Sequence, residues 1–241
     1  MNVLRKSLIL TLLIIAVHSV AAQSKFTDEA LFANYLSGKM DLWGKYLAST
    51  DQQKNLTGDE LARAVNYDYG YIAWLIDEKR RDEALYRMEI YEDRIEKLSQ
   101  DEDVDEADVY VYRASLAAFK WLLNKLKLNY ARQAINFTDK AITENPTNPR
   151  ALSLLGNAQF NNPFGSNKDA AKTLLKGIEM FEKYGESEHN WNYTATRLSL
   201  VQCYEKLGQT DKAIKYAQQI LKENPDFLYL RNVYLPKLMS K

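Results

Sequence analysis

The chain has 241 residues, of which 46% are hydrophobic and 27% are charged, and this composition is typical of a globular protein rather than a disordered one. It contains 32 basic and 32 acidic residues, so it lacks the basic excess that proteins binding nucleic acid usually carry. The single cysteine, Cys203, excludes an intramolecular disulfide and a cysteine-rich metal site.

The N-terminus has the pattern of a secretory signal peptide. Two basic residues precede an apolar run of 11 residues, 7–17, whereas a membrane-spanning helix needs about 20. Small side chains at Val20 and Ala22 suit a cleavage site, and the Ala-Ala-Gln ending resembles that of exported Gram-negative proteins. We therefore expect a signal peptide over 1–22 and a periplasmic or secreted protein without stable membrane insertion. An uncleaved anchor is the alternative.

The next part of the chain is predicted to be helical throughout. Residues 23–60 are expected to form an N-terminal helical cap, and Thr57 and Glu60 have the spacing of a capping box at the start of the following helix. Residues 61–126 are expected to form divergent helical hairpins, because their apolar side chains recur every three or four residues. The predicted helices there cover residues 61–77, 82–98 and 109–126.

An acidic run at residues 101–106 lies between the last two of these helices. We interpret it as a solvated loop whose negative charge favours the N-terminus of the next helix. A site for a cation or a basic partner is the alternative.

Two segments of the C-terminal half repeat each other. Asn129–Pro146 aligns with Gln209–Pro225, and each ends in Asn-Pro, where the proline cannot continue a helix. A looser copy at Asp169–Lys183 follows Ser166, which is placed to cap that helix. Further helices are predicted over 149–160 and 191–207, the latter ending at a glycine turn, so the copies form helical hairpins.

These hairpins resemble the tetratricopeptide repeat, a unit of about 34 residues. The resemblance implies an all-α fold, an α-solenoid of stacked antiparallel helical hairpins in a right-handed superhelix. Residues 127–241 are predicted to hold the repeats and a C-terminal capping helix, and an insertion at 161–167 departs from the repeat spacing. The positions that carry the resemblance are Ala134, Ala141, Pro146, Leu155, Gly156, Tyr204, Ala213, Ile220 and Pro225.

The resemblance implies a scaffold that binds a protein or peptide on the concave face of the array, without catalysis and without a cofactor. Polar side chains that we expect to contact the partner are Asn157, Asn161, Asn192 and Gln202. Tyr69 and Trp74 belong to an aromatic cluster at residues 67–74, which suits either core packing or a binding groove. The alternative function is a module that binds a glycan or small molecule through this cluster.

A hydrolase using His189 and Cys203 is a third hypothesis. We interpret His189 as part of a solvated loop and Cys203 as a small core residue, so no catalytic or metal-binding residue is predicted. The sequence also lacks a glycine-rich phosphate loop and an H-E-x-x-H motif. The apolar tail at residues 227–236 is expected to cover the last hairpin, with an exposed anchor for a partner as the alternative.

Overall fold

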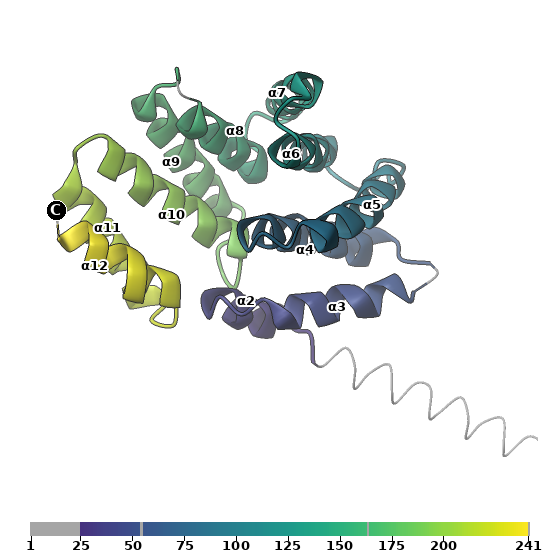
Figure 1. Ribbon diagram of the computed structural model, residues 1–241, viewed down its shortest axis with the longest axis horizontal. Coiled ribbons are helices and arrows are strands. Elements are labelled where there is room, and N and C mark those ends of the chain that lie inside the picture. The colour runs from purple at the N-terminus through teal and green to yellow at the C-terminus, as the bar shows by residue number, and fades with distance from the viewer. Residues whose placement is uncertain (1–24, 54, 163, 241) are drawn as a thin grey trace, which may run out of the picture.

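The structure, a computed structural model, describes residues 25–53, 55–162 and 164–240, which form helices joined by short turns (Figure 1). The helices are α2 (Asp28–Leu36), α3 (Asp41–Asp51), α4 (Gly58–Asp77), α5 (Arg81–Leu98), α6 (Glu106–Leu123), α7 (Leu128–Glu144), α8 (Pro149–Asn161), α9 (Asn167–Lys183), α10 (Trp191–Lys206), α11 (Thr210–Glu223), the π-helix η1 (Leu230–Tyr234) and α12 (Leu235–Met239). These described residues include no β-strand, so the predicted all-α class is confirmed. None of the described helices has the length and apolarity that crossing a membrane requires. The predicted signal peptide, 1–22, lies outside the described residues.

Consecutive helices pack as hairpins. α4 pairs with α5, α6 with α7, α8 with α9, and α10 with α11. The first helices of successive hairpins also touch, α4 with α6, α6 with α8 and α8 with α10, so that the hairpins stack into a curved array (Figure 1). The architecture is the predicted α-solenoid of stacked helical hairpins.

Local signals in the sequence explain where several helices begin and end. The Ser166 hydroxyl accepts a hydrogen bond from the backbone N–H of Asp169 at 3.1 Å, as predicted for the start of α9. Gly208, with φ of 71°, follows the end of α10. α7 and α11 end at Glu144 and Glu223, two residues before the two prolines of the repeated Asn-Pro pairs.

Two local predictions are wrong. Thr57 is the residue before α4, but its side chain makes no capping hydrogen bond. Gly58 has a left-handed φ of 56°, so the chain enters α4 by a turn that does not align the hydroxyl with the first backbone amides. The helix predicted to reach Leu126 ends at Leu123, and Leu126 is 93% exposed in the turn that reverses the chain into α7.

Most of the repeat positions lie at helix–helix contacts. Ala141, Ala213, Ile220 and Tyr204 are buried. A Cβ added at Gly156 would lie 2.7 Å from the side chain of Leu174, so this glycine allows α8 and α9 to approach closely, as its place in the repeat predicts. Ala134 and Leu155 are half-buried, and Pro146 and Pro225 are exposed in the turns.

The buried apolar side chains form two clusters on opposite sides of α4. One cluster joins α4 to α5, α6, α7 and α8. The other joins α2 and α3 to α9, α10, α11 and α12, and it includes Tyr67 of α4. The two ends of the array therefore share one core, and α2 and α12 lie near each other in Figure 1. The Tyr35 and Phe227 rings lie 5.8 Å apart.

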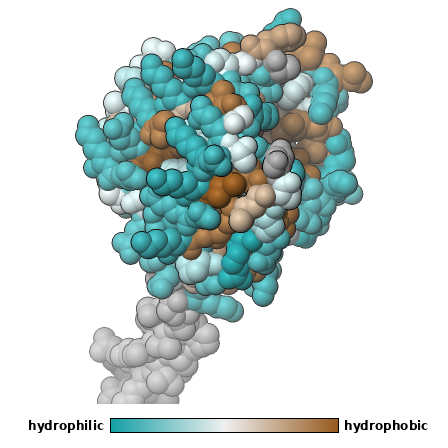
Figure 2. Space-filling view, turned by 90° about the vertical axis from the view of Figure 1, so that its left-hand side faces the viewer, coloured by the Kyte–Doolittle hydropathy of each residue, from teal (hydrophilic) through white to brown (hydrophobic). Residues whose placement is uncertain are grey.

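The C-terminal segment covers the last hairpin. Phe227, Leu230, Tyr234 and Leu238 are buried, as expected for a cap over the end of the array. Its outer face exposes three apolar side chains, Tyr229, Val233 and Met239. Figure 2 shows the side of the molecule on which α11 and α12 lie, with apolar side chains visible between hydrophilic ones.

A network of buried charges links α3, α4 and α5. Asp68 of α4 is fully buried, and its two oxygens lie 2.5 Å from Arg87 and 2.7 Å from Arg94, both on α5. Asp51, at the end of α3, contacts the same two arginines at 2.7 and 2.9 Å. Burial raises the pKa of Asp68, and the two guanidinium groups oppose that rise. Two carboxylates thus balance two arginines in the interior.

Candidate functional site

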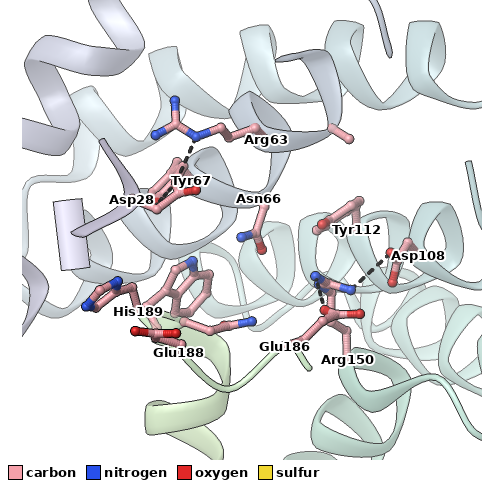
Figure 3. A pocket seen from close by; sticks show the side chains of 13 residues that line it. Asp28, Arg63, Asn66, Tyr67, Asp108, Tyr112, Arg150, Glu186, Glu188 and His189 are labelled. Atoms are coloured by element: carbon pink, nitrogen blue, oxygen red, sulfur yellow. Dashed lines mark hydrogen bonds and ion pairs between the residues drawn. The ribbon is translucent and has the colours of Figure 1, made fainter. Parts of the chain in front are cut away.

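A pocket of about 400 Å³ opens where several hairpins meet. Its walls come from the N-terminal halves of α4 and α6, from the first turn of α8, from the loop between α9 and α10 with the start of α10, and from the start of α2 (Figure 3). The residues that line it are Asp28, Ala62, Arg63, Asn66, Tyr67, Asp108, Tyr112, Arg150, Glu186, Glu188, His189, Asn190 and Trp191. The pocket therefore lies on the first helices of the hairpins and uses residues that are far apart in the sequence.

One wall is organised around Asp28 at the start of α2. Its Oδ1 accepts hydrogen bonds from Arg63 Nε at 2.8 Å and from the Tyr67 hydroxyl at 3.0 Å. Arg63 also donates to the carbonyl oxygen of Phe26, and its guanidinium lies over the Tyr46 ring, 4.7 Å from the centroid. These contacts fix the N-terminus of α2 against α4 and leave Arg63 neutralised.

The opposite wall is organised around Arg150 in the first turn of α8. Its guanidinium contacts Asp108 of α6 at 3.3 Å and Glu186 of the α9–α10 loop at 2.6 Å. Asn148, which caps α8, donates a further hydrogen bond to Asp108 at 2.9 Å. Burial raises the pKa of Asp108, and Arg150 acts in the opposite direction. Figure 3 shows this group and the Asp28 group on opposite sides of Asn66.

The loop between α9 and α10 brings Glu186, Glu188 and His189 to the pocket. Gly185, with φ of 72°, ends α9, and the N–H of Glu186 donates to the carbonyl of Phe181 at 2.8 Å. This pattern is a Schellman motif, in which a left-handed glycine satisfies the last carbonyls of a helix. His189 also has a left-handed φ, 50°, and its ring lies 5.9 Å from that of Phe32 on α2.

Two residues that line the pocket, Tyr112 and Trp191, carry hydrogen-bond donors that have no partner among the residues that the structure describes. Trp191 is 9% exposed, and its indole Nε1 is buried without a hydrogen bond. Tyr112 is 3% exposed, and its hydroxyl points into the pocket without a described partner (Figure 3). Burial raises the pKa of Tyr112, which keeps this hydroxyl protonated and able to donate. A buried donor such as the Trp191 indole N–H is rarely left unsatisfied, so it indicates a place for an acceptor.

Negatively charged side chains outnumber the arginines around the pocket. Four carboxylates, those of Asp28, Asp108, Glu186 and Glu188, line it together with the two guanidinium groups of Arg63 and Arg150. These carboxylates exceed the two guanidinium groups by two negative charges.

The partner-binding residues predicted from sequence do not converge on this pocket. Asn161 lies at the end of α8, where its side chain donates to the carbonyl of Asn157 at 2.9 Å. Gln202 lies in the last turns of α10 and is half-buried. Asn192 is buried and donates to Asn66, a pocket residue on α4, at 2.8 Å. It thus ties α10 to α4 directly beside the pocket.

The predicted aromatic cluster occupies interior positions. The Tyr69 ring lies 5.5 Å from Trp191 and 5.9 Å from Phe119, between the two cores. Trp74 is half-buried, stacks on Tyr71 at 5.4 Å and lies under the guanidinium of Arg80. This arrangement favours the core-packing interpretation of the cluster over a binding groove. Of its residues, only Tyr67 lines the pocket.

The structure separates His189 from Cys203. Cys203 lies twelve residues after Trp191 on α10, which is about 18 Å along the axis at 1.5 Å per residue, whereas His189 precedes that helix. Cys203 is fully buried, and burial raises the pKa of its thiol to about 11. The two side chains therefore cannot act as a catalytic dyad, and Cys203 has the core position that the sequence predicts.

The charged residues of the pocket, above all Arg63, Asp108 and Arg150, were not predicted from the sequence. Each stands in an amphipathic helix where a charged side chain normally faces water. One signal was available, since Asp108 directly precedes the predicted helix 109–126 and Arg150 lies in the first turn of the predicted helix 149–160. Such positions meet at one end of the stack when the hairpins are arranged side by side.

The sequence matches no protein-family model, and no curated protein matches it either. Among solved structures, the HusA haemophore from Porphyromonas gingivalis is similar, with 16% sequence identity and a TM-score of 0.45. The similarity covers 78% of this chain and 90% of that chain.

Proposed function

We propose that this protein is an exported, non-catalytic binding protein that holds a segment of a protein or peptide partner in the pocket between α4, α6, α8 and the α9–α10 loop. We also propose that its hairpins are tetratricopeptide repeats. The observation that carries the proposal is the buried indole Nε1 of Trp191, a pocket residue, which has no hydrogen-bond partner among the described residues. The Tyr112 hydroxyl, which points into the same pocket, is a second donor available to an occupant (Figure 3). An extended peptide supplies carbonyl acceptors at regular intervals, which suits such donors.

The setting of the pocket agrees with this role. Its walls come from four successive hairpins and from α2, so an occupant contacts many elements at once, as ligands of repeat proteins do. Its volume of about 400 Å³ suits one or two side chains rather than a whole domain. The rest of the partner would then extend along the first helices.

The charged groups on the walls favour binding over catalysis. Asp28 is held by Arg63, and Asp108 and Glu186 are held by Arg150. Carboxylates fixed by arginines are poor candidates for a general acid and base, which need to exchange protons with a substrate. The thiol of Cys203 lies in the core and not in the pocket.

A pocket-filling substitution tests the proposal. Ala62 lines the pocket, so Ala62→Trp should fill it and abolish binding of peptides selected by the native protein from a random display library. Ala73→Trp, at an exposed position of the same helix, is the matched control and should bind these peptides normally. Both variants should keep the helical circular-dichroism spectrum. Equal binding by the two variants, or a library that yields no binder, would contradict the proposed function.

A further inference from the structure

We infer that the turn between α6 and α7 binds the surface of a lipid bilayer that carries anionic headgroups. Apolar side chains of the turn insert between the lipids, and the lysines beside them contact the headgroups. The contact is peripheral, and it goes beyond the proposed function because it uses the end of α6 that is remote from the pocket. Asp108 and Leu123 are fifteen residues apart on that helix, which corresponds to about 22 Å.

The turn and the start of α7 expose a patch of apolar side chains. Leu126 is 93% exposed, and Leu128 and Ile135 are each 60% exposed. Leu128 and Ile135 are seven residues apart on α7, so they lie on the same face of that helix. α7 packs on α6 and α8, and Figure 1 shows it on the outside of the array. Single exposed leucines are common, but three large apolar side chains within one short segment indicate an interaction surface.

The same segment is strongly basic. Residues 120–138 have no acidic side chain and four basic ones, Lys120, Lys125, Lys127 and Arg132. Two glutamates of α5 line the adjacent cavity, and one of them, Glu92, pairs with Lys120 at 2.7 Å. The other three basic side chains are exposed and form no ion pair with any residue that the structure describes. Cations therefore remain in excess around the apolar patch, which complements a surface with many negative charges.

Hydrogen bonds hold the turn in its outward conformation. Arg81 of α5 donates to the carbonyl oxygen of Leu123 at 2.8 Å, and the N–H of Lys127 donates to the carbonyl oxygen of Asn124 at 3.0 Å. The ammonium group of Lys127 lies 5.8 Å from the centroid of the Tyr130 ring. Tyrosine and lysine both combine an apolar body with a polar tip, which suits the headgroup level of a bilayer.

A bilayer suits this turn better than a protein partner does. The patch lies on a protruding turn and not in a groove. Lysine is depleted at protein–protein interfaces, where aromatic residues and arginine are enriched. Leucines flanked by lysines are instead typical of segments that lie in the interfacial layer of a membrane.

Flotation with lipid vesicles tests the inference. The full mature chain should float with vesicles made of equal parts phosphatidylcholine and phosphatidylglycerol. Its partition constant for vesicles of phosphatidylcholine alone should be lower by about tenfold or more, since each basic side chain near an anionic surface contributes roughly fivefold. Added salt should weaken the binding, because it screens the exposed charges.

Two double variants separate the apolar contribution from the electrostatic one. Leu126→Ser with Leu128→Ser should lower the partition constant for the anionic vesicles by about tenfold or more, because two inserted side chains are lost. Lys125→Gln with Lys127→Gln should lower it by a similar factor. All four positions are exposed, so both variants should keep the native melting temperature.

The matched control is the double variant Met239→Ser with Lys215→Gln. Met239 is 61% exposed on α12 and Lys215 is exposed on α11, and Figure 1 shows these helices on the opposite side of the array from α7. This variant should bind the anionic vesicles as the native chain does.

An environment-sensitive fluorophore locates the contact. A nitrobenzoxadiazole group attached at Leu126→Cys should shift its emission to the blue on addition of the anionic vesicles, and the same group at Met239→Cys should not. Cys203 is fully buried, so it stays unlabelled in the folded protein. No vesicle binding, native binding by the leucine variant, or an unshifted fluorophore at position 126 would overturn the inference. A photo-crosslinker at position 126 that captures a protein and no lipid in the host envelope would overturn it too.

Discussion

At the scale of single residues, the structure differs from a generic stack of amphipathic helices in how many charges it buries. Asp68, Arg87, Arg94 and Arg197 are all almost fully buried. Arg197 of α10 pairs with Glu223 of α11, and its guanidinium lies over the ring of Tyr216. Charges placed in this way cost desolvation energy, so they persist only where each has a partner of opposite sign.

The network around Asp68 yields a prediction for stability. Asp68→Asn removes one of two carboxylates that face Arg87 and Arg94, and a buried charge without its partner costs about 3–5 kcal/mol. Urea denaturation should show a loss of that size in the free energy of unfolding. Asp93→Asn, at an exposed position of α5, serves as the control and should change it by less than about 0.5 kcal/mol. A loss below about 1 kcal/mol for Asp68→Asn would mean that the network contributes little to the free energy of unfolding.

At the scale of the helices, α4 is the central element, because it contacts both cores. Gly70 lies where one face of α4 meets the indole rings of both Trp43 and Trp191. A Cβ at this position would lie 2.6 Å from Trp43 Cζ3 and 3.0 Å from Trp191 Cζ2. The glycine thus permits the tryptophans of α3 and α10 to pack directly against the α4 backbone.

A pair of glycine substitutions tests this packing. Gly70→Ala should destabilise the fold by about 1–3 kcal/mol, because the new methyl group overpacks two buried rings. Gly44→Ala on α3 meets only the hydroxyl end of the half-buried Tyr71 side chain, which can move. That variant should be neutral or more stable by up to about 1 kcal/mol, through the higher helix propensity of alanine. Denaturation curves of the two variants that coincide would show that α4 is not tightly enclosed at Gly70.

The helices themselves were largely predictable from the sequence, since their apolar spacing, the Ser166 cap and the Asn-Pro stops are local signals. The predictions that were wrong, the Thr57 cap and the helix end at Leu126, also concern local structure. Thr57 has the right spacing for a capping box, but the left-handed Gly58 changes the first turn. The candidate site could not be predicted in the same way. Asp28, Asp108 and Glu186 meet only because of the curvature of the array, and curvature depends on packing angles that no single segment encodes.

At the scale of the whole molecule, the array closes on itself. The N-terminal pair α2 and α3 shares a core with α9 to α12, and Trp43 and Trp191 lie 5.6 Å apart in it. In an open linear array each repeat contacts only its neighbours. Contact between the two ends adds long-range coupling, and it also places Asp28 and His189 at the same pocket.

Because the two ends of the array are in contact, residues from opposite ends of the chain should be energetically coupled. The Tyr35 and Phe227 rings lie 5.8 Å apart, so a double-mutant cycle with Tyr35→Ala and Phe227→Ala should give a coupling energy of about 0.5–1.5 kcal/mol. The free energies of unfolding come from urea titrations of the native protein, the two single variants and the double variant. Strictly additive losses would indicate that the two ends fold without contact.

The central claim, that a partner occupies the pocket, is tested most directly by photo-crosslinking in the native host. A benzoylphenylalanine at position 188, an exposed position that lines the pocket, should form a covalent adduct with a partner protein, detected by a mass shift and identified by mass spectrometry. The same residue at position 179, on the outside of α9, should form none. An adduct formed from position 179 and absent from position 188 would contradict the account, because the partner would then bind another face of the molecule.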